Sequence, residues 1–277
     1  MESILDLLFD PNQKKRPRRT GIYGPEGIGK SSLGAKWPDP VFLPTEDGLR
    51  DIKGVRSFPM LSGLGDMLNR KSMTDGKTPS LRTLIDGMAS QPSLPFKTLV
   101  IDTIDGLHKK VESYCCEVYT TEERGYGKDV GLYADCWQRV LNALEWLNLN
   151  RGLEIVLLSH YQVEKFKDPL GDSYNFYAPR LHTKSSDLIR DWCDEFLFFN
   201  YVTLVVKKDE GFNNTRNVAV ESGNRSLFTT KKPGYVAKSR IRNLPEEIPV
   251  LKTSTYHDLI GQYLPAAPVT PTFSVAG

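Results

Sequence analysis

Short apolar runs alternate with segments of helical periodicity along the first 160 residues of the chain. The apolar runs predict buried strands at 20–23, 41–43, 98–102 and 154–160. Between them, apolar residues at helical spacing predict helices near 32–36, 81–88 and 137–149. Strands separated by helices are typical of a parallel sheet covered on both faces, so the pattern predicts an α/β fold.

The pattern changes after residue 160. Residues 161–180 are polar and rich in aromatic side chains, which predicts a loop, and strand-like runs follow at 195–199, 202–206, 218–221 and 227–230. With 277 residues, a single large domain is the simplest organisation. We expect an N-terminal helix and basic linker over 1–19, a core over 20–263, and a flexible proline-rich tail over 264–277.

The charge balance is nearly even, with 36 Lys and Arg against 34 Asp and Glu. It gives no general attraction to nucleic acid or anionic membranes, so any nucleic-acid contact must be local. The start of the chain has neither a basic leader nor a long apolar run, which predicts a cytoplasmic protein without a membrane anchor. The four cysteines include no CxxC pair and are expected to be reduced packing thiols.

Two short N-terminal segments leave alternatives open. Residues 3–9 predict an amphipathic helix, which either docks on a neighbouring subunit or packs on its own domain. The basic run 14–19 is either a solvated approach to the first strand or a contact for a phosphate backbone.

A glycine-rich loop lies between the first predicted strand and the first predicted helix. Its glycines let backbone N–H groups surround phosphate oxygens, Lys30 reaches the β- and γ-phosphates, and the Ser31 hydroxyl ligates magnesium. Two glycines at this spacing before Lys-Ser rarely arise by chance, so the loop predicts binding of ATP with Mg²⁺. The predicted nucleotide-binding residues are Gly24, Pro25, Glu26, Gly27, Ile28, Gly29, Lys30, Ser31 and Ser32.

Carboxylates at two predicted strand ends complete a hydrolytic site. Asp102 ends the third strand and is expected to hold the magnesium shell, with Asp105 as the fallback. The alternative is that Asp102 caps the next helix. Glu46 follows the second strand and is expected to act as general base on water, because strand carboxyl ends face the nucleotide crevice. The alternative is that Glu46 and Asp47 only solvate a turn.

The fourth strand ends in Ser159-His160, where several NTPases keep a polar residue that senses the γ-phosphate. The stretch that follows combines aromatic stacking surfaces with cations, as single-strand binders do; a buried aromatic cluster is the alternative. A second wall of a DNA groove is expected from the stretch 120–133. The predicted DNA-binding residues are Lys128, Tyr161, Lys165, Phe166, Lys167, Tyr174, Phe176, Tyr177 and Arg180.

Cations also gather near the end, over 231–240. Lys238 and Arg240 are candidates for a contact with a neighbouring subunit's γ-phosphate, as an arginine finger makes. A solvated hairpin is the alternative.

The order of these features resembles RecA-type core ATPases, most closely the small phage-encoded RecA-like proteins of the Sak and RadB kind. The resemblance covers about residues 18–250. It rests on the loop 24–32, on Glu46, on the run Leu99 to Asp102, on Ser159-His160, and on Lys238-Ser-Arg240 followed by Leu244-Pro245. It departs from RecA in having Ser-His where RecA has glutamine and in having only a short tail.

The resemblance implies a RecA-like P-loop core whose mostly parallel sheet gains antiparallel strands at its C-terminal end. It implies that Glu46 activates water, that Ser159 and His160 couple nucleotide to DNA, and that Lys238 and Arg240 act in trans within a ring or filament. Single-strand annealing in phage recombination, in the host cytoplasm, is the function this favours. A single-strand-binding protein is a further candidate partner. A nucleotide-gated loading module and a small-molecule phosphotransferase are the alternatives.

Overall fold

The computed structural model describes residues 16–67, 79–169, 171–209 and 215–264, with the backbone alone for 204–209 and 215–221. A parallel sheet forms its centre. The strands β1 (Arg19–Gly24), β2 (Pro40–Pro44), β4 (Thr98–Asp102) and β5 (Glu154–Phe166) are predicted strands, and β3 (Arg56–Ser57) and the start of β7 (Glu195–Asp209) extend the parallel set. The order is β10-β8-β7-β1-β5-β4-β2-β3.

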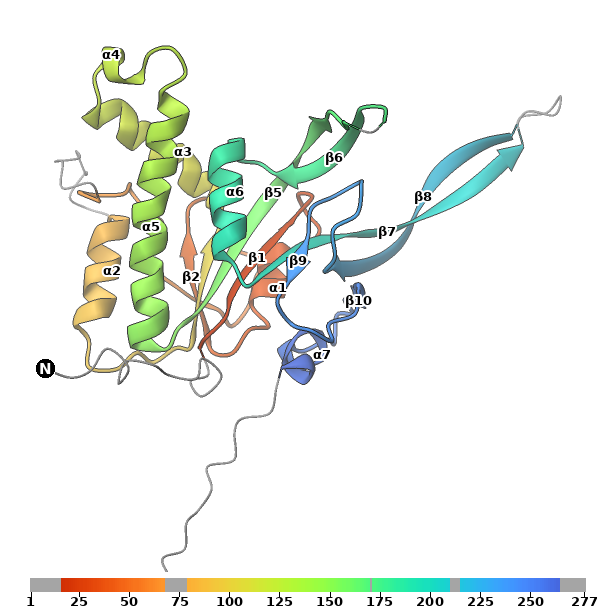
Figure 1. Ribbon diagram of the computed structural model, residues 1–277. Coiled ribbons are helices and arrows are strands. Elements are labelled where there is room, and N and C mark those ends of the chain that lie inside the picture. The colour runs from red at the N-terminus through yellow and green to blue at the C-terminus, as the bar shows by residue number, and fades with distance from the viewer. Residues whose placement is uncertain (1–15, 68–78, 170, 210–214, 265–277) are drawn as a thin grey trace, which may run out of the picture.

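Antiparallel strands join this sheet at its C-terminal end, as the resemblance implied. They are β8 (Thr215–Phe228) and β10 (Glu247–Pro249) beyond β7, the short β9 (Lys238–Ser239) on β7, and β6 (Tyr174–Pro179) on the end of β5. Figure 1 shows the β5–β6 and β7–β8 hairpins extending away from α2 and α5. The predicted fold class is therefore confirmed.

Helices cover both faces of the sheet because apolar side chains alternate along the strands. On one face, α2 (Leu81–Ser90), α3 (Ile104–Val118), α5 (Asp129–Arg151) and α6 (Thr183–Trp192) pack on residues such as Tyr23 and Leu43. On the other face, α1 (Lys30–Gly34) and α7 (Tyr256–Leu259) pack on residues such as Ile22 and Phe42. A one-turn α4 (Thr121–Arg124) precedes α5, and a 3₁₀ turn spans Gly261–Tyr263.

Several predicted boundaries are wrong. Residues 161–180 are not a loop but largely a hairpin, because β5 runs on to Phe166 and pairs with β6. The runs at 195–199 and 202–206 are one strand, as are those at 218–221 and 227–230. The stretch 120–133 holds α4 and the start of α5. Most of the expected N-terminal helix and linker, and all of the tail from 265, lie outside the described residues.

The sequence prediction also missed α3. Its signal is present: the Thr103 hydroxyl accepts a hydrogen bond from the Gly106 N–H as an N-cap, and Leu107, Val111 and Tyr114 follow at helical spacing. Polar residues between these positions weaken the apolar periodicity that predicts a helix. This helix positions part of the site described next.

Candidate nucleotide-binding and catalytic site

The glycine loop connects β1 to α1 and depends on glycine at defined points. A Cβ on Gly24 would lie 2.0 Å from the carbonyl oxygen of Phe199 on β7, so a side chain has no room there. Gly27 and Gly29 have φ of 74° and 99°, a left-handed region that favours glycine. The loop therefore has the backbone that a phosphate cradle needs.

Lys30 folds back into this loop. Its side chain is buried, and its Nζ donates to the carbonyl oxygens of Gly24 at 3.1 Å and Pro25 at 2.8 Å. Burial lowers the pKa of Lys30 to about 8, although nearby carboxylates, Asp105 and Asp102 first, act in the opposite direction. The ammonium thus lies at the mouth of the loop, where phosphate charge would stabilise its protonated form.

Asp102 and Ser31 fit the magnesium role. Burial raises the pKa of Asp102, while a hydrogen bond from the Ser31 hydroxyl lowers it. Asp102 Oδ2 is buried and has no hydrogen-bond partner among the described residues. A buried oxygen without a partner is costly, and hard oxygen ligands suit Mg²⁺. The alternative that Asp102 caps α3 is wrong, because Thr103 is the N-cap.

Glu46 faces the same cavity. The cavity holds about 360 Å³ and is lined by Lys30, Ser31, Asp102 and Glu46, among others. Glu46 Oε1 accepts a hydrogen bond from the Thr103 hydroxyl, and 43% of the Glu46 side chain is exposed, so water can reach it. Its neighbour Asp47 also lines the cavity, and its carboxylate pairs with Arg50 at the surface. The role of Glu46 as general base stays a prediction.

Asp105 forms the centre of a hydrogen-bonded cluster behind this cavity. Its Oδ1 accepts from the Ser159 hydroxyl at 3.3 Å and the His160 N–H at 3.0 Å. Its Oδ2 accepts from His160 Nδ1 at 2.8 Å and Arg180 Nη2 at 2.9 Å. Burial would raise the pKa of Asp105, but the bonds from His160 and Arg180 outweigh it and hold the pKa well below its usual range. A carboxylate offers about four acceptor positions, so these partners leave none for a metal.

Two arginines reach this loop from distant parts of the chain. Arg180, just after β6, also bonds Glu26 Oε1 at 3.1 Å through Nη1. Arg225 on β8 donates to the Ile28 carbonyl at 2.8 Å and lies over the Phe199 ring. The sequence offered no signal for Arg225, because a single arginine between two strand-like runs is unremarkable before the partner strand is known.

The aromatic residues predicted to bind DNA divide into two groups. Tyr161 and Tyr177 pack against the hydrophobic core, their ring centroids 4.8 Å apart, as the buried-cluster alternative expected. Farther along the hairpin, Phe166 contacts Tyr174 and Phe176, with centroids at 5.2 and 6.3 Å. The sequence pattern alone did not distinguish these groups.

An open groove of about 560 Å³ lies along this outer part of the hairpin. Five of the predicted DNA-binding residues and several cations from elsewhere line it together. They are Lys165, Phe166, Lys167, Tyr174, Phe176, Arg190, Lys231 and Lys232. The Tyr177 N–H bonds the Gly234 carbonyl at 2.8 Å and joins the two segments.

The other wall of this groove is thus 231–236 with α6, and the stretch 120–133 does not line it. Lys128 is exposed at the start of α5. Lys238 and Arg240 lie at the opposite end of the parallel strands from the glycine loop, since β9 pairs with the first residues of β7. There Arg240 bonds Asp194 at 2.8 Å and Lys238 bonds the Asp191 carbonyl at 3.2 Å. They cannot serve their own subunit's loop, and their action in trans stays a prediction.

A family model described as an AAA domain matches residues 16–241. The chain belongs to this family. A SPbeta prophage-derived uncharacterized protein of Bacillus subtilis (strain 168), YorG, is 26% identical over 149 residues, which are 52% of this chain. The match spans 41% of that protein. Together with the fold, these two matches confirm the resemblance to phage-encoded RecA-like P-loop ATPases.

Two solved structures are similar to this AAA domain. A RadB recombinase aligns with a TM-score of 0.43 and 15% identity over 86% of this chain and 89% of that chain. A KaiC-like protein from Pyrococcus horikoshii OT3 aligns with a TM-score of 0.41 and 11% identity over 85% of each chain. Among the helices that the structure describes, none combines the length and apolar character needed to cross a membrane.

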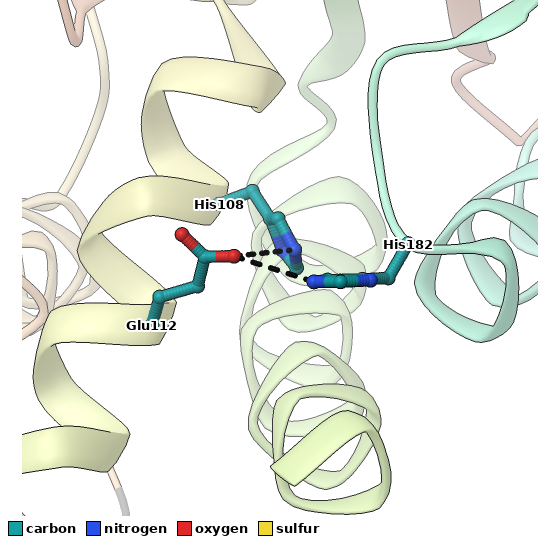
Figure 2. Close-up of side chains that lie close together, drawn as sticks. All are labelled: His108, Glu112 and His182. Carbon is teal, nitrogen blue, oxygen red and sulfur yellow. Dashed lines mark ion pairs between the residues drawn. The ribbon is translucent and has the colours of Figure 1, made fainter. Parts of the chain in front are cut away.

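Beside the site, the AAA domain holds a second cluster of possible ligands, His108, Glu112 and His182 (Figure 2). Glu112 Oε1 lies 3.6 Å from His108 Nε2 and 3.4 Å from His182 Nε2. However, the Trp137 indole N–H donates to His108 Nδ1 at 2.8 Å. An indole nitrogen only donates, so the neutral ring carries its proton on Nε2, and that atom has no lone pair for a metal. Burial, then His182, lowers the pKa of His108 to about 4, so the ring is neutral near pH 7. This arrangement does not fit a metal ion.

Proposed function

We propose that this AAA domain is an ATP-dependent single-stranded-DNA-binding protein that hydrolyses ATP during single-strand annealing in phage recombination. One observation carries the proposal: β5 holds Ser159 and His160 beside the nucleotide cavity and Lys165 and Phe166 in the groove, on one continuous strand. A change in nucleotide therefore has a direct route to the groove.

In the proposed reaction, Lys30 and the loop N–H groups hold the phosphates, and Glu46 takes a proton from the attacking water. Ser31 and Asp102 would hold Mg²⁺, which supplies positive charge against the phosphate oxygens when bound. Thr103 orients Glu46 through its hydroxyl. The open cavity beside Glu46 leaves room for that water.

The groove suits a single strand better than a duplex. Phe166 is 38% exposed and could stack with a base, while Lys165 and Lys167 are exposed and attract phosphates. In a duplex, the faces of the bases are already stacked on one another. We therefore assign Tyr174 and Phe176 to the same stacking surface, with Arg190, Lys231 and Lys232 along the backbone.

The oligomeric part of the proposal concerns Lys238 and Arg240. In a ring or filament they would reach the neighbouring subunit's γ-phosphate and complete its site. Their distance from their own glycine loop supports action in trans. A single-strand-binding protein is a further partner, and the host cytoplasm is the expected place of action.

The decisive experiment measures ATP hydrolysis at low salt with a polythymidine oligonucleotide, with an equal mass of duplex DNA, and without DNA, while light scattering follows assembly. We expect the single strand to accelerate hydrolysis and to promote assembly. Equal rates in all three samples, with no DNA binding at low salt where phosphate contacts are strongest, would refute the proposal. DNA binding without measurable turnover would instead favour the nucleotide-gated loading module.

A further inference from the structure

Arg180 joins the glycine loop to the base of the hairpin. Its guanidinium bonds Glu26 in the loop at 3.1 Å and Asp105 behind the cavity at 2.9 Å, and its Nη2 lies 2.9 Å from His160 Nδ1. Its backbone N–H bonds the His160 carbonyl at 2.9 Å, which closes the hairpin where β6 ends. Arg180 does not line the groove but a smaller cavity of about 250 Å³ with Asp105 and Gln162. Its position thus suits the nucleotide site better than direct DNA contact.

The present partners of Arg180 have other groups that can take its place. Asp105 is almost fully buried, but the Ser159 hydroxyl and the His160 N–H and ring stay beside its carboxylate when the arginine leaves. The Glu26 side chain is 71% exposed, and water can replace the guanidinium there. Arg180 itself is 41% exposed, so it can move without being drawn out of a core.

Phosphate competes well for such an arginine. Arg180 already lies near enough to Lys30 to lower the pKa of that ammonium, so both cations act on the same region. A guanidinium binds phosphate oxygens through two parallel N–H groups, and such charged bonds exceed a screened surface ion pair in strength. ATP brings a γ-phosphate to this region, and ADP does not.

We infer that Arg180 is a γ-phosphate-sensing residue of its own subunit, which exchanges Glu26 and Asp105 for the γ-phosphate and thereby changes the hairpin that binds DNA. The inference rests on the proposed function and adds the residue that couples nucleotide binding to DNA binding. The exchange forms no covalent bond. It moves one cation from two carboxylates to the phosphate, and the backbone bond from Arg180 to His160 carries the movement into β5 and β6.

The test measures the affinity of a fluorescent polythymidine oligonucleotide with a slowly hydrolysed ATP analogue and with ADP, both with Mg²⁺. For the wild type we expect the two affinities to differ by about tenfold or more. Arg180→Ala should reduce that ratio to about twofold or less, because it removes the contact that is proposed to carry the γ-phosphate signal into the hairpin. Arg82→Ala, which removes an exposed arginine paired with Asp86 on α2, is the matched control and should keep the wild-type ratio.

A second readout is the affinity of fluorescent nucleotides without DNA. Arg180→Ala should lose about tenfold of the preference for the ATP analogue over ADP, the worth of one charged hydrogen-bonded contact. Glu26→Gln should act in the opposite direction and raise DNA affinity in the ADP state, since it frees Arg180 from the loop.

Failure can be assigned to one proposal or the other. If the wild type binds DNA in a nucleotide-dependent way and Arg180→Ala keeps the full ratio, the Arg180 inference is wrong and the proposed function stands. If the wild type binds no single strand with either nucleotide, the proposed function is wrong. Should Arg180→Ala fail to fold, Arg180→Lys keeps the positive charge but lacks the two parallel N–H donors of the guanidinium. It should lower both ratios severalfold, and unchanged ratios would overturn the inference.

Discussion

The nucleotide cavity and the hairpin groove differ in how closely their residues are constrained. In the cavity, Gly24 abuts a neighbouring strand, Lys30 is buried, and Asp105 has every acceptor position occupied. In the groove, Phe166 and the lysines are exposed, and Gly171, between β5 and β6 outside the groove, has open space around it. Phosphate transfer needs fixed geometry, whereas stacking and phosphate attraction tolerate many arrangements. Substitutions should therefore act sharply in the first region and gradually in the second.

The largest effect is expected at Glu46. Glu46→Gln keeps size and removes the base, so ATP hydrolysis should fall by about 10²- to 10⁴-fold while nucleotide affinity stays near that of the wild type. Steady-state phosphate release and fluorescent-nucleotide titration measure the two quantities. Asp86→Asn, on the exposed face of α2, is the control. If Glu46→Gln leaves the hydrolysis rate unchanged, Glu46 is not the general base.

The next comparison uses one glycine from the nucleotide site and one from the turn between β5 and β6. Gly24→Ala places a Cβ 2.0 Å from the Phe199 carbonyl oxygen, and we expect the free energy of unfolding to fall by about 3 kcal/mol. Gly171→Ala meets nothing within 4 Å and should change it by less than about 0.5 kcal/mol. Urea denaturation followed by circular dichroism measures both. Equal losses would contradict the proposed difference in constraint.

In the groove, the double variant Lys165→Ala with Lys167→Ala should weaken single-strand affinity by about tenfold at low salt. Two lost phosphate contacts should also reduce the slope of log affinity against log salt by about 1.4. ATP hydrolysis without DNA should stay at the wild-type rate. Lys53→Ala, at an exposed position outside the groove, supplies the control. An unchanged slope would show that these lysines do not contact the phosphates of the DNA.

The smallest effect concerns the protonation of Lys30. Its pKa of about 8 in the loop without nucleotide means that most of the population is neutral above that pH, and the charge of a bound phosphate raises the pKa again. Binding of ADP with Mg²⁺ should therefore take up almost no proton at pH 7 and close to one at pH 9, and affinity should fall as pH rises. Calorimetry in buffers of different ionisation enthalpy measures this uptake. No uptake at pH 9 would show that Lys30 stays charged in the empty loop.

The stability contribution of Lys30 has the corresponding sign. In the unfolded chain Lys30 keeps its proton up to about pH 10.4, whereas in the folded chain it releases the proton at about pH 8. Between these values the unfolded state binds more protons, so this group favours folding more as pH rises. Below pH 8, burying the charged ammonium lowers the free energy of unfolding. A bound phosphate compensates this cost most in that pH range.

The amino-acid sequence by itself determined the glycine loop, the carboxylate Asp102 and the α/β fold. These features depend on local chemistry: a turn that needs glycine, a Lys-Ser pair beside it, and apolar runs long enough for strands. Glu46 could be proposed in the same way, because it directly follows a strand. The long helix α5 was found because its apolar spacing is strong.

Only the tertiary structure decided which distant residues meet. Arg180 is 75 positions from Asp105, and Arg225 is 197 from Ile28, so neither contact has a local signal. The same holds for the aromatic residues after 160, since packing against β7 made Tyr177 part of the core and left Phe166 at the surface. Side-chain type gives the chemistry that a residue can perform. Long-range strand pairing decides which partner the residue meets.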